Sequence, residues 1–162
     1  MLLQQLLNGV VVGGVYALFA VGFNLVFGVQ RLLNLAHGAV FMTGAFVAYY
    51  TVRAGGPLIL GFVAAAVASG VLAMIIEVVC FRRLRKSGDA EFGAIISSMG
   101  AGMVIMTFWQ WVSQTQVLRF PFDTVPVVIY RFWGLRVSLL QLLMAAAAIA
   151  IVLVMAWFIY RT

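Results

Sequence analysis

Long apolar stretches separated by short polar ones dominate the pattern along the chain. Five apolar segments can be distinguished, at approximately residues 6–27, 37–52, 57–79, 92–113 and 138–160. A helix rises about 1.5 Å per residue, so about 20 apolar residues cross a hydrocarbon core of roughly 30 Å. The second segment is short for a full crossing. No alternating run is long enough for a barrel of strands, so the pattern predicts spanning helices, whose backbone groups bond internally.

The composition identifies these segments as parts of a membrane protein. Of 162 residues, 65% are hydrophobic and 9% are charged, and the mean hydropathy is +1.15, which is far from the balance of a water-soluble domain. The predicted fold is therefore an all-α, polytopic transmembrane helix bundle of about five segments, in which the second is the candidate for a discontinuous or half-helix. The net charge is +6, and four of the ten basic residues lie together in one short loop, so the positive-inside bias explains the charge and no nucleic-acid partner is expected.

The orientation follows from the loop at residues 81–91, which lies between two apolar segments. Its basic residues are Arg82, Arg83, Arg85 and Lys86. Because cytoplasmic loops carry the excess of lysine and arginine, this loop is predicted to be cytoplasmic and residues 114–137 to lie outside. The N-terminus is outside if segment 37–52 is a complete span, and inside if that segment is a half-helix that dips and returns.

Polar residues cluster at a break between the first two apolar segments. Asn24, Asn34 and His37 bracket this break, which is the pattern of a discontinuous helix that lines a translocation pathway. Asn34 is a favourable N-cap for a helix starting at Leu35, and free amides at that helix start would attract a carboxylate. The alternative is that residues 29–36 form a plain cytoplasmic turn in which Arg31 obeys the positive-inside rule.

Glu77 is the only acidic residue inside a predicted span. It lies about one turn from the basic loop, so it can reach the cytoplasmic interface or pair with an arginine such as Arg82; a gating or docking contact is the alternative. The residues that we consider for the cytoplasmic loop or for contact with a partner are therefore Glu77, Arg82, Arg83, Arg85 and Lys86.

Other features are consistent with a bundle and not with an enzyme. Small residues recur on the first segment, and Gly93, Ser97 and Ala101 follow one another at four-residue spacing on the fourth, which lets helix backbones approach closely in lipid. The sequence has one histidine, one cysteine, no phosphate-binding loop and no paired carboxylates within a span, so neither catalysis nor a metal site is expected.

Several motifs resemble the permease subunits of bacterial branched-chain amino acid ABC transporters. These motifs are NG at 8–9, GGVYALFAVGFNLVFGV at 13–29, NLAHGAVFMTGA at 34–45, IEVVCFRRLR at 76–85 and GAIISSMGAGMVI at 93–105. The resemblance covers nearly the whole chain, and the motifs are specific when taken together. One departure is Arg83, where the family often has proline.

The resemblance implies a multi-pass subunit of the bacterial inner membrane that imports branched-chain or related amino acids by alternating access. Its partners would be a second related permease, cytoplasmic subunits that bind the ATP, and a periplasmic binding protein; no cofactor is expected in this chain. The family's Asn and His map onto Asn34 and His37, in or near the pathway. The family's members are longer, so residues 1–162 resemble the N-terminal part of a permease domain, as a fragment or a truncated product. The alternative function is a small helical channel or assembly protein not coupled to nucleotide.

Overall fold

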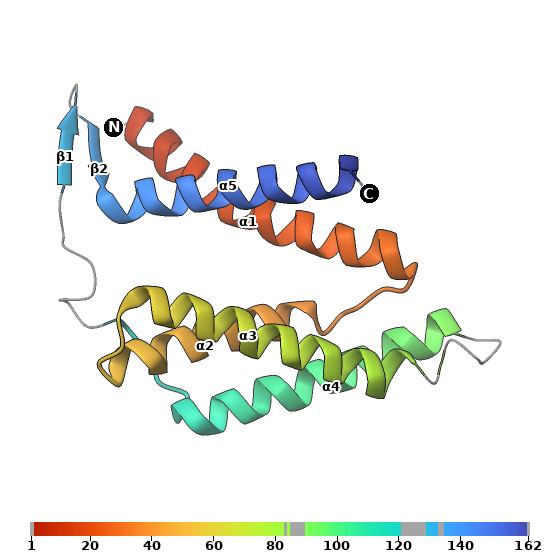
Figure 1. Cartoon of the computed structure of the whole chain (residues 1–162). Helices are drawn as coiled ribbons and strands as arrows, with labels where there is room; N and C mark the ends of the chain where they lie inside the picture. The colour runs from red at the N-terminus through yellow and green to blue at the C-terminus, as the bar shows by residue number, and fades with distance from the viewer. Residues whose placement is uncertain (1, 83, 85–89, 121–128, 133–134, 162) are drawn as a thin grey trace. The chain divides into compact units, whose positions relative to one another are not determined.

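A computed structural model describes residues 2–82, 84, 90–120, 129–132 and 135–161. Within these ranges the five α-helices are α1 (Leu2–Gln30), α2 (His37–Arg53), α3 (Leu58–Ile76), α4 (Ala90–Ser113) and α5 (Leu139–Arg161) (Figure 1). A π-helical turn, η1 (Glu77–Phe81), extends α3, and two short strands, β1 (Ile129–Phe132) and β2 (Leu135–Ser138), precede α5. The predicted all-α fold class is confirmed, and all five apolar segments are helical.

Four of the described helices are long and apolar enough to cross a membrane. They are α1, α3 with η1, α4 and α5. Helix α2 has 17 residues, which corresponds to about 26 Å at 1.5 Å per residue, less than a hydrocarbon core of roughly 30 Å. The prediction that the second segment is short is therefore confirmed.

The chain divides into two compact units, and the first comprises residues 1–25 and 125–162. In it β1 and β2 pair antiparallel, with Tyr130 opposite Val137; the sequence did not predict this hairpin. Helix α5 begins with a capping box, because Gln141 N donates to Ser138 Oγ over 3.2 Å and Ser138 N donates to Gln141 Oε1 over 3.0 Å. Gln141 Nε2 also donates to Asn8 Oδ1 over 3.0 Å, which ties the start of α5 to α1.

The second unit, residues 26–124, contains α2, α3 and α4. Helices α2 and α3 run antiparallel with glycines at their contact: Gly44 faces Ser69, and Gly61 faces Val52 (Figure 1). Small residues allow this close approach, which drives helix association where lipid replaces water. Helix α4 also packs on α2 and runs parallel to it, because Gly102 lies next to Ala36 and Trp109 next to Thr43.

Trp109 joins α4 to α2. Its Nε1 donates to Thr43 Oγ1 over 2.9 Å, and Thr43 Oγ1 donates to Ala39 O over 2.8 Å. The indole ring stacks on Phe46, with ring centroids 4.6 Å apart and an interplanar angle of 6°. The contact thus combines a partly buried hydrogen bond with aromatic packing.

A double-mutant cycle with Trp109→Phe and Thr43→Val should isolate this hydrogen bond. Phenylalanine keeps an aromatic ring over Phe46 but has no N–H, so the coupling free energy should be about 0.6–1 kcal/mol, as for hydrogen bonds between membrane helices. The measurement is unfolding by denaturing detergent in mixed micelles. A coupling free energy of zero would contradict a stabilising role for the bond.

The π-helical turn brings three side chains of one helix to the same side. In a regular α-helix, with about 100° per residue, Ile76 and Cys80 share a face but Phe81 lies about 140° away from Ile76. In η1, Arg82 N donates to Glu77 O over 2.9 Å, closing a wider turn with one more residue. As a result Ile76, Cys80 and Phe81 are all buried, with exposed fractions of 3%, 5% and 1%.

The predicted small-residue face of α4 packs against the end of α3 and the segment beyond it. A Cβ atom on Gly93 would lie 2.9 Å from Leu84 Cδ2, Cys80 Sγ lies 3.8 Å from Ser97 O, and Ala101 packs on the buried core. Close packing is therefore confirmed for α4. Among the described residues, a Cβ atom on the α1 glycines 9, 13, 14 or 28 would meet nothing within 4 Å.

Candidate functional site

The helix break that the sequence predicts lies at residues 31–36, between α1 and α2. Arg31 ends α1 in the left-handed backbone region, with φ of 53°, and its N–H donates to Phe27 O over 2.7 Å. This is the hydrogen-bond pattern of a helix stop in the αL conformation, a position that usually holds glycine. Helix α2 then begins at His37. We call residues 31–36 the break segment.

The break segment packs along the first half of α4. Three α4 residues one turn apart line it: Ala94 and Ser98 are both 0% exposed, and Gly102 is also buried. A Cβ atom on Gly102 would lie 3.5 Å from Ala36 Cα. These small residues leave room for the non-helical backbone to lie directly on the helix.

Hydrogen bonds satisfy the backbone of the break segment at this contact. Leu35 N donates to Ser98 Oγ over 3.1 Å, Ala36 N donates to Asn34 Oδ1 over 3.0 Å, and His37 N donates to Asn34 O over 3.3 Å. Non-helical backbone is tolerated at membrane depth only where such partners exist, because lipid offers none. The three amides at residues 35–37 therefore meet the requirement for irregular backbone inside a bilayer.

The predicted start of the second helix is corrected by two residues, because regular α-helix α2 begins at His37 rather than Leu35. The Asn34 side chain nevertheless makes a capping bond, since its Oδ1 accepts from Ala36 N–H two residues on. The amides of Leu35, Ala36 and His37 all donate within the protein. The sequence suggested that these amides would bind a substrate carboxylate. Because they already donate within the protein, they are not free to do so.

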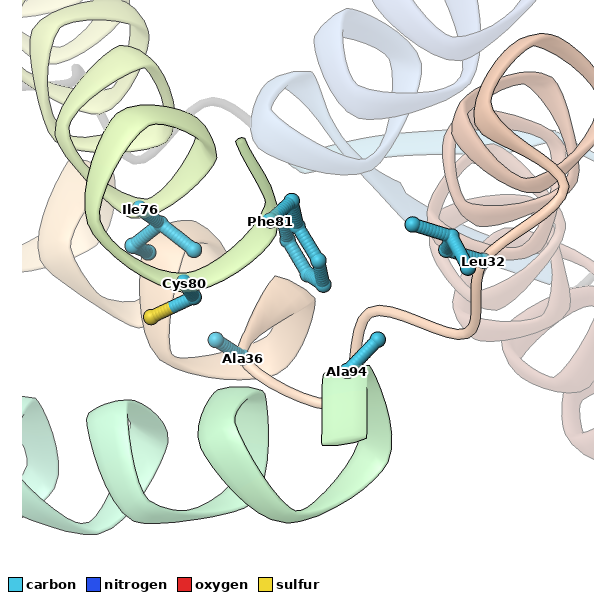
Figure 2. Close-up of a cluster of buried hydrophobic side chains, with 6 residues drawn as sticks. All are labelled: Leu32, Ala36, Ile76, Cys80, Phe81 and Ala94. Atoms are coloured by element: carbon cyan, nitrogen blue, oxygen red, sulfur yellow. The ribbon is translucent and has the colours of Figure 1, made fainter. Parts of the chain in front are cut away.

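A buried apolar cluster fixes the break segment from the side of η1. Figure 2 shows its six side chains, which come from the segment, from the end of α3 with η1, and from α4. The members are Leu32, Ala36, Ile76, Cys80, Phe81 and Ala94. The Phe81 ring extends from η1 into the cluster that includes Leu32, Ala36 and Ala94, and it is 1% exposed, so it fills the space between η1 and the segment.

Two of the three predicted pathway residues lie in the second unit. Asn34 and His37 lie at the end of the break segment and the start of α2, and both are half-buried. Asn24 lies exposed on the part of α1 that belongs to the first unit.

The predicted partner-contact residues lie at or after η1. Glu77 is half-buried in the π-helical turn, and Arg82, directly after it, is exposed. Arg83, Arg85 and Lys86 lie outside the described residues. Among the residues that the structure does describe, no three His, Cys, Asp or Glu side chains are grouped as a metal site requires.

Sequence reasoning missed Ser98 and Phe81 as parts of this site. The small-residue spacing on α4 indicated a packing face, but it selected residues 93, 97 and 101, one position before the residues that carry the break segment. The partner of Ser98 lies 63 positions away in the sequence, so no local pattern could have found it.

The chain matches the family model described as branched-chain amino acid transport system, permease component, over residues 5–162. No solved structure matches it significantly. The matched family consists of transport permeases and not of enzymes, in agreement with the sequence prediction.

Curated relatives carry the same description. The high-affinity branched-chain amino acid transport system permease protein LivH of Escherichia coli K12 is 35% identical over 115 residues, which is 65% of this chain and 37% of LivH. The corresponding protein BraD of Pseudomonas aeruginosa is 33% identical over 112 residues, 64% of this chain and 36% of BraD. The matched part of the chain thus spans a little over a third of the length of these relatives. The chain belongs to this family of branched-chain amino acid transport permeases, multi-pass proteins of the bacterial inner membrane.

Proposed function

We propose that residues 1–162 form the N-terminal part of the transmembrane permease domain of an ATP-driven importer, which moves branched-chain or related amino acids across the inner membrane by alternating access. The observation that carries this proposal is the break segment, whose non-helical backbone lies along a membrane-spanning helix. In transporters, interrupted helices of this kind mark the substrate pathway.

The position along α4 at which the break segment makes contact supports the proposal that this segment lies within the depth of the membrane. Counted from Ala90, the first residue of α4, Ser98 lies roughly 12 Å and Gly102 roughly 18 Å along a helix of about 36 Å, at 1.5 Å per residue. The segment therefore reaches about the middle of the span. A plain cytoplasmic turn would contact α4 only near Ala90, so this geometry favours the discontinuous helix over the surface turn.

An orientation follows when the basic loop after η1 is placed in the cytoplasm. Helix α4 then leads outward, α3 leads inward, and α2, which runs parallel to α4, starts in the middle of the membrane and ends outside. The break segment enters from the cytoplasmic side, next to Phe81. Helix α1 accordingly leads inward, with the N-terminus outside.

The partners that we propose are a second related permease subunit, cytoplasmic subunits that bind and hydrolyse ATP, and a periplasmic substrate-binding protein. LivH and BraD are permease proteins of a transport system, which supports an assembly of this kind. Glu77 and Arg82, with Arg83, Arg85 and Lys86 after them in the sequence, are the residues that we propose for contact on the cytoplasmic side. The ATP would be held by the partner subunits.

Cysteine accessibility tests the pathway directly. Asn34→Cys and His37→Cys are each made in a Cys80→Ser background, in the full-length gene product assembled with its partners in proteoliposomes. Labelling by a membrane-impermeant maleimide from one side should change by about tenfold or more when ATP is added, because alternating access exposes a pathway residue to each side in turn. A cysteine at exposed Val117, outside the helices, serves as the control whose labelling should not respond to ATP.

The same preparation separates the importer from the alternative of a channel or assembly protein. The result that supports an importer for branched-chain amino acids is ATP-dependent uptake of labelled leucine, isoleucine or valine. An excess of either of the other two unlabelled amino acids should reduce this uptake, whereas an excess of urea should not. Labelling from the cytoplasmic side alone, indifferent to ATP, would make residues 29–36 an ordinary inner loop and exclude the proposed pathway. Uptake without ATP would instead support a channel.

A further inference from the structure

Ser98 is the polar side chain that joins α4 to the break segment. Its side chain is fully buried, with an exposed fraction of 0%, inside a helix that is long and apolar enough to span the membrane. Its Oγ accepts a hydrogen bond from Leu35 N over 3.1 Å. A polar group in such a position costs free energy unless its hydrogen bonds are satisfied, and this one is satisfied by backbone far away in the sequence.

The hydroxyl proton of Ser98 has two acceptors within reach. Oγ lies 3.2 Å from Ile95 O on its own helix and 3.5 Å from Leu33 O on the break segment. A serine hydroxyl has one proton to donate and two lone pairs. The segment is thus held by one hydrogen bond when the proton goes to Ile95, and by two when it goes to Leu33.

We propose that Ser98 is the positioning residue of the break segment: its hydroxyl holds Leu35 in place and, by redirecting its proton between Leu33 and Ile95, sets how readily the segment moves along α4. This inference rests on the transport role proposed above. The segment can shift by a small distance while its amide at Leu35 keeps a partner, so the hydroxyl lowers the free-energy cost of motion in a medium that offers no water.

Small residues above and below Ser98 support this assignment. Ala94 and Gly102, one turn to either side, are buried beneath the segment, and Gly102 carries no side chain that would block Ala36. The contact surface on α4 is therefore nearly flat. On this surface Ser98 supplies the directional hydrogen bond, whereas its two neighbours supply only space.

The test compares Ser98→Ala and Ser98→Cys with the matched control Ser97→Ala, in the full-length permease assembled with its partners. Alanine removes the hydroxyl, and cysteine keeps the volume but bonds weakly. Ser97 is the adjacent residue, and its carbonyl rather than its hydroxyl contacts Cys80. For every variant, the readouts are the KM and the maximal rate of ATP-dependent leucine uptake. For Ser98→Ala, a further readout is the maleimide labelling rate of Asn34→Cys in the Cys80→Ser background.

We expect Ser98→Ala to raise the labelling rate about tenfold, because the Leu35 amide loses its partner and the segment is held less firmly. We expect Ser98→Ala and Ser98→Cys both to lower the maximal uptake rate at least about fivefold with little change in KM, because motion of the segment then leaves a buried amide without a partner. Ser97→Ala should match the parent. Unchanged labelling in Ser98→Ala, wild-type uptake in Ser98→Cys, or faster labelling with normal uptake would each overturn the inference. If the parent shows no ATP-dependent uptake, the proposed function fails, while the labelling rates still decide whether Ser98 positions the segment.

Discussion

Phe81→Ala is expected to lower the free energy of unfolding by about 2–3 kcal/mol, less than the 3–5 kcal/mol usual for such truncations in water-soluble cores. The ring is 1% exposed and fills the space between η1 and Leu32 (Figure 2). Removing it leaves a cavity in the buried cluster. The cost is reduced because the unfolded chain stays in an apolar medium, so the transfer of the ring from water contributes little and the lost packing contributes most.

Phe62→Ala is the matched control for Phe81→Ala. Phe62 lies on α3, the same continuous helix, but its side chain is 65% exposed, so lipid or detergent replaces the lost contacts and the loss should stay within about 0.5 kcal/mol. Denaturing-detergent titrations of both variants in mixed micelles measure the difference. Equal losses for the two variants would mean that Phe81 does not hold η1 against the break segment.

Gly61→Leu is expected to destabilise the contact of α2 with α3 by about 3 kcal/mol, at the upper end of the usual cost of overpacking. A Cβ atom at this position would lie 3.1 Å from Val52 Cγ2 and 3.3 Å from the backbone oxygen of Ala48. The Val52 side chain could turn aside, but the Ala48 backbone cannot. The two helices must therefore separate, with loss of packing along their whole contact.

Gly70→Leu tests whether the position, rather than the type of substitution, causes this loss. Gly70 lies on the same helix, and a Cβ atom there would meet nothing within 4 Å. Leucine favours the helix over glycine by about 0.5–1 kcal/mol, so this control should be neutral or slightly stabilising. Thermal unfolding in detergent, followed by circular dichroism, compares the two variants. Similar melting temperatures for Gly61→Leu and Gly70→Leu would contradict close packing at Gly61.

The helices could be predicted from the sequence because their signal is local. Each predicted apolar segment ends within a few residues of the observed helix; for example, the segment at 92–113 corresponds to α4, Ala90–Ser113. In lipid the helix is the only spanning element that satisfies its own backbone, so length and hydropathy were sufficient. The hairpin before α5 carries too few residues per strand to give a comparable signal.

The site was less predictable because its parts are joined across long sequence distances. Polar residues around the break indicated where the helix is interrupted, and this was correct. The partners of the segment were not predictable: Ser98 and Phe81 act through contacts with Leu35 and Leu32. The π-helical turn made Phe81 harder to predict, because regular α-helical spacing places Phe81 on a different face from Ile76.

The π-helical turn also determines how this chain must be compared with its relatives. A π turn closes with one more residue than an α turn, so a relative with a plain α-helix here reaches the same point with one residue fewer. An alignment without a gap would then pair Phe81 with a residue on a different face of that relative's helix. In a comparison with such a relative, the one-residue gap belongs within Glu77–Phe81.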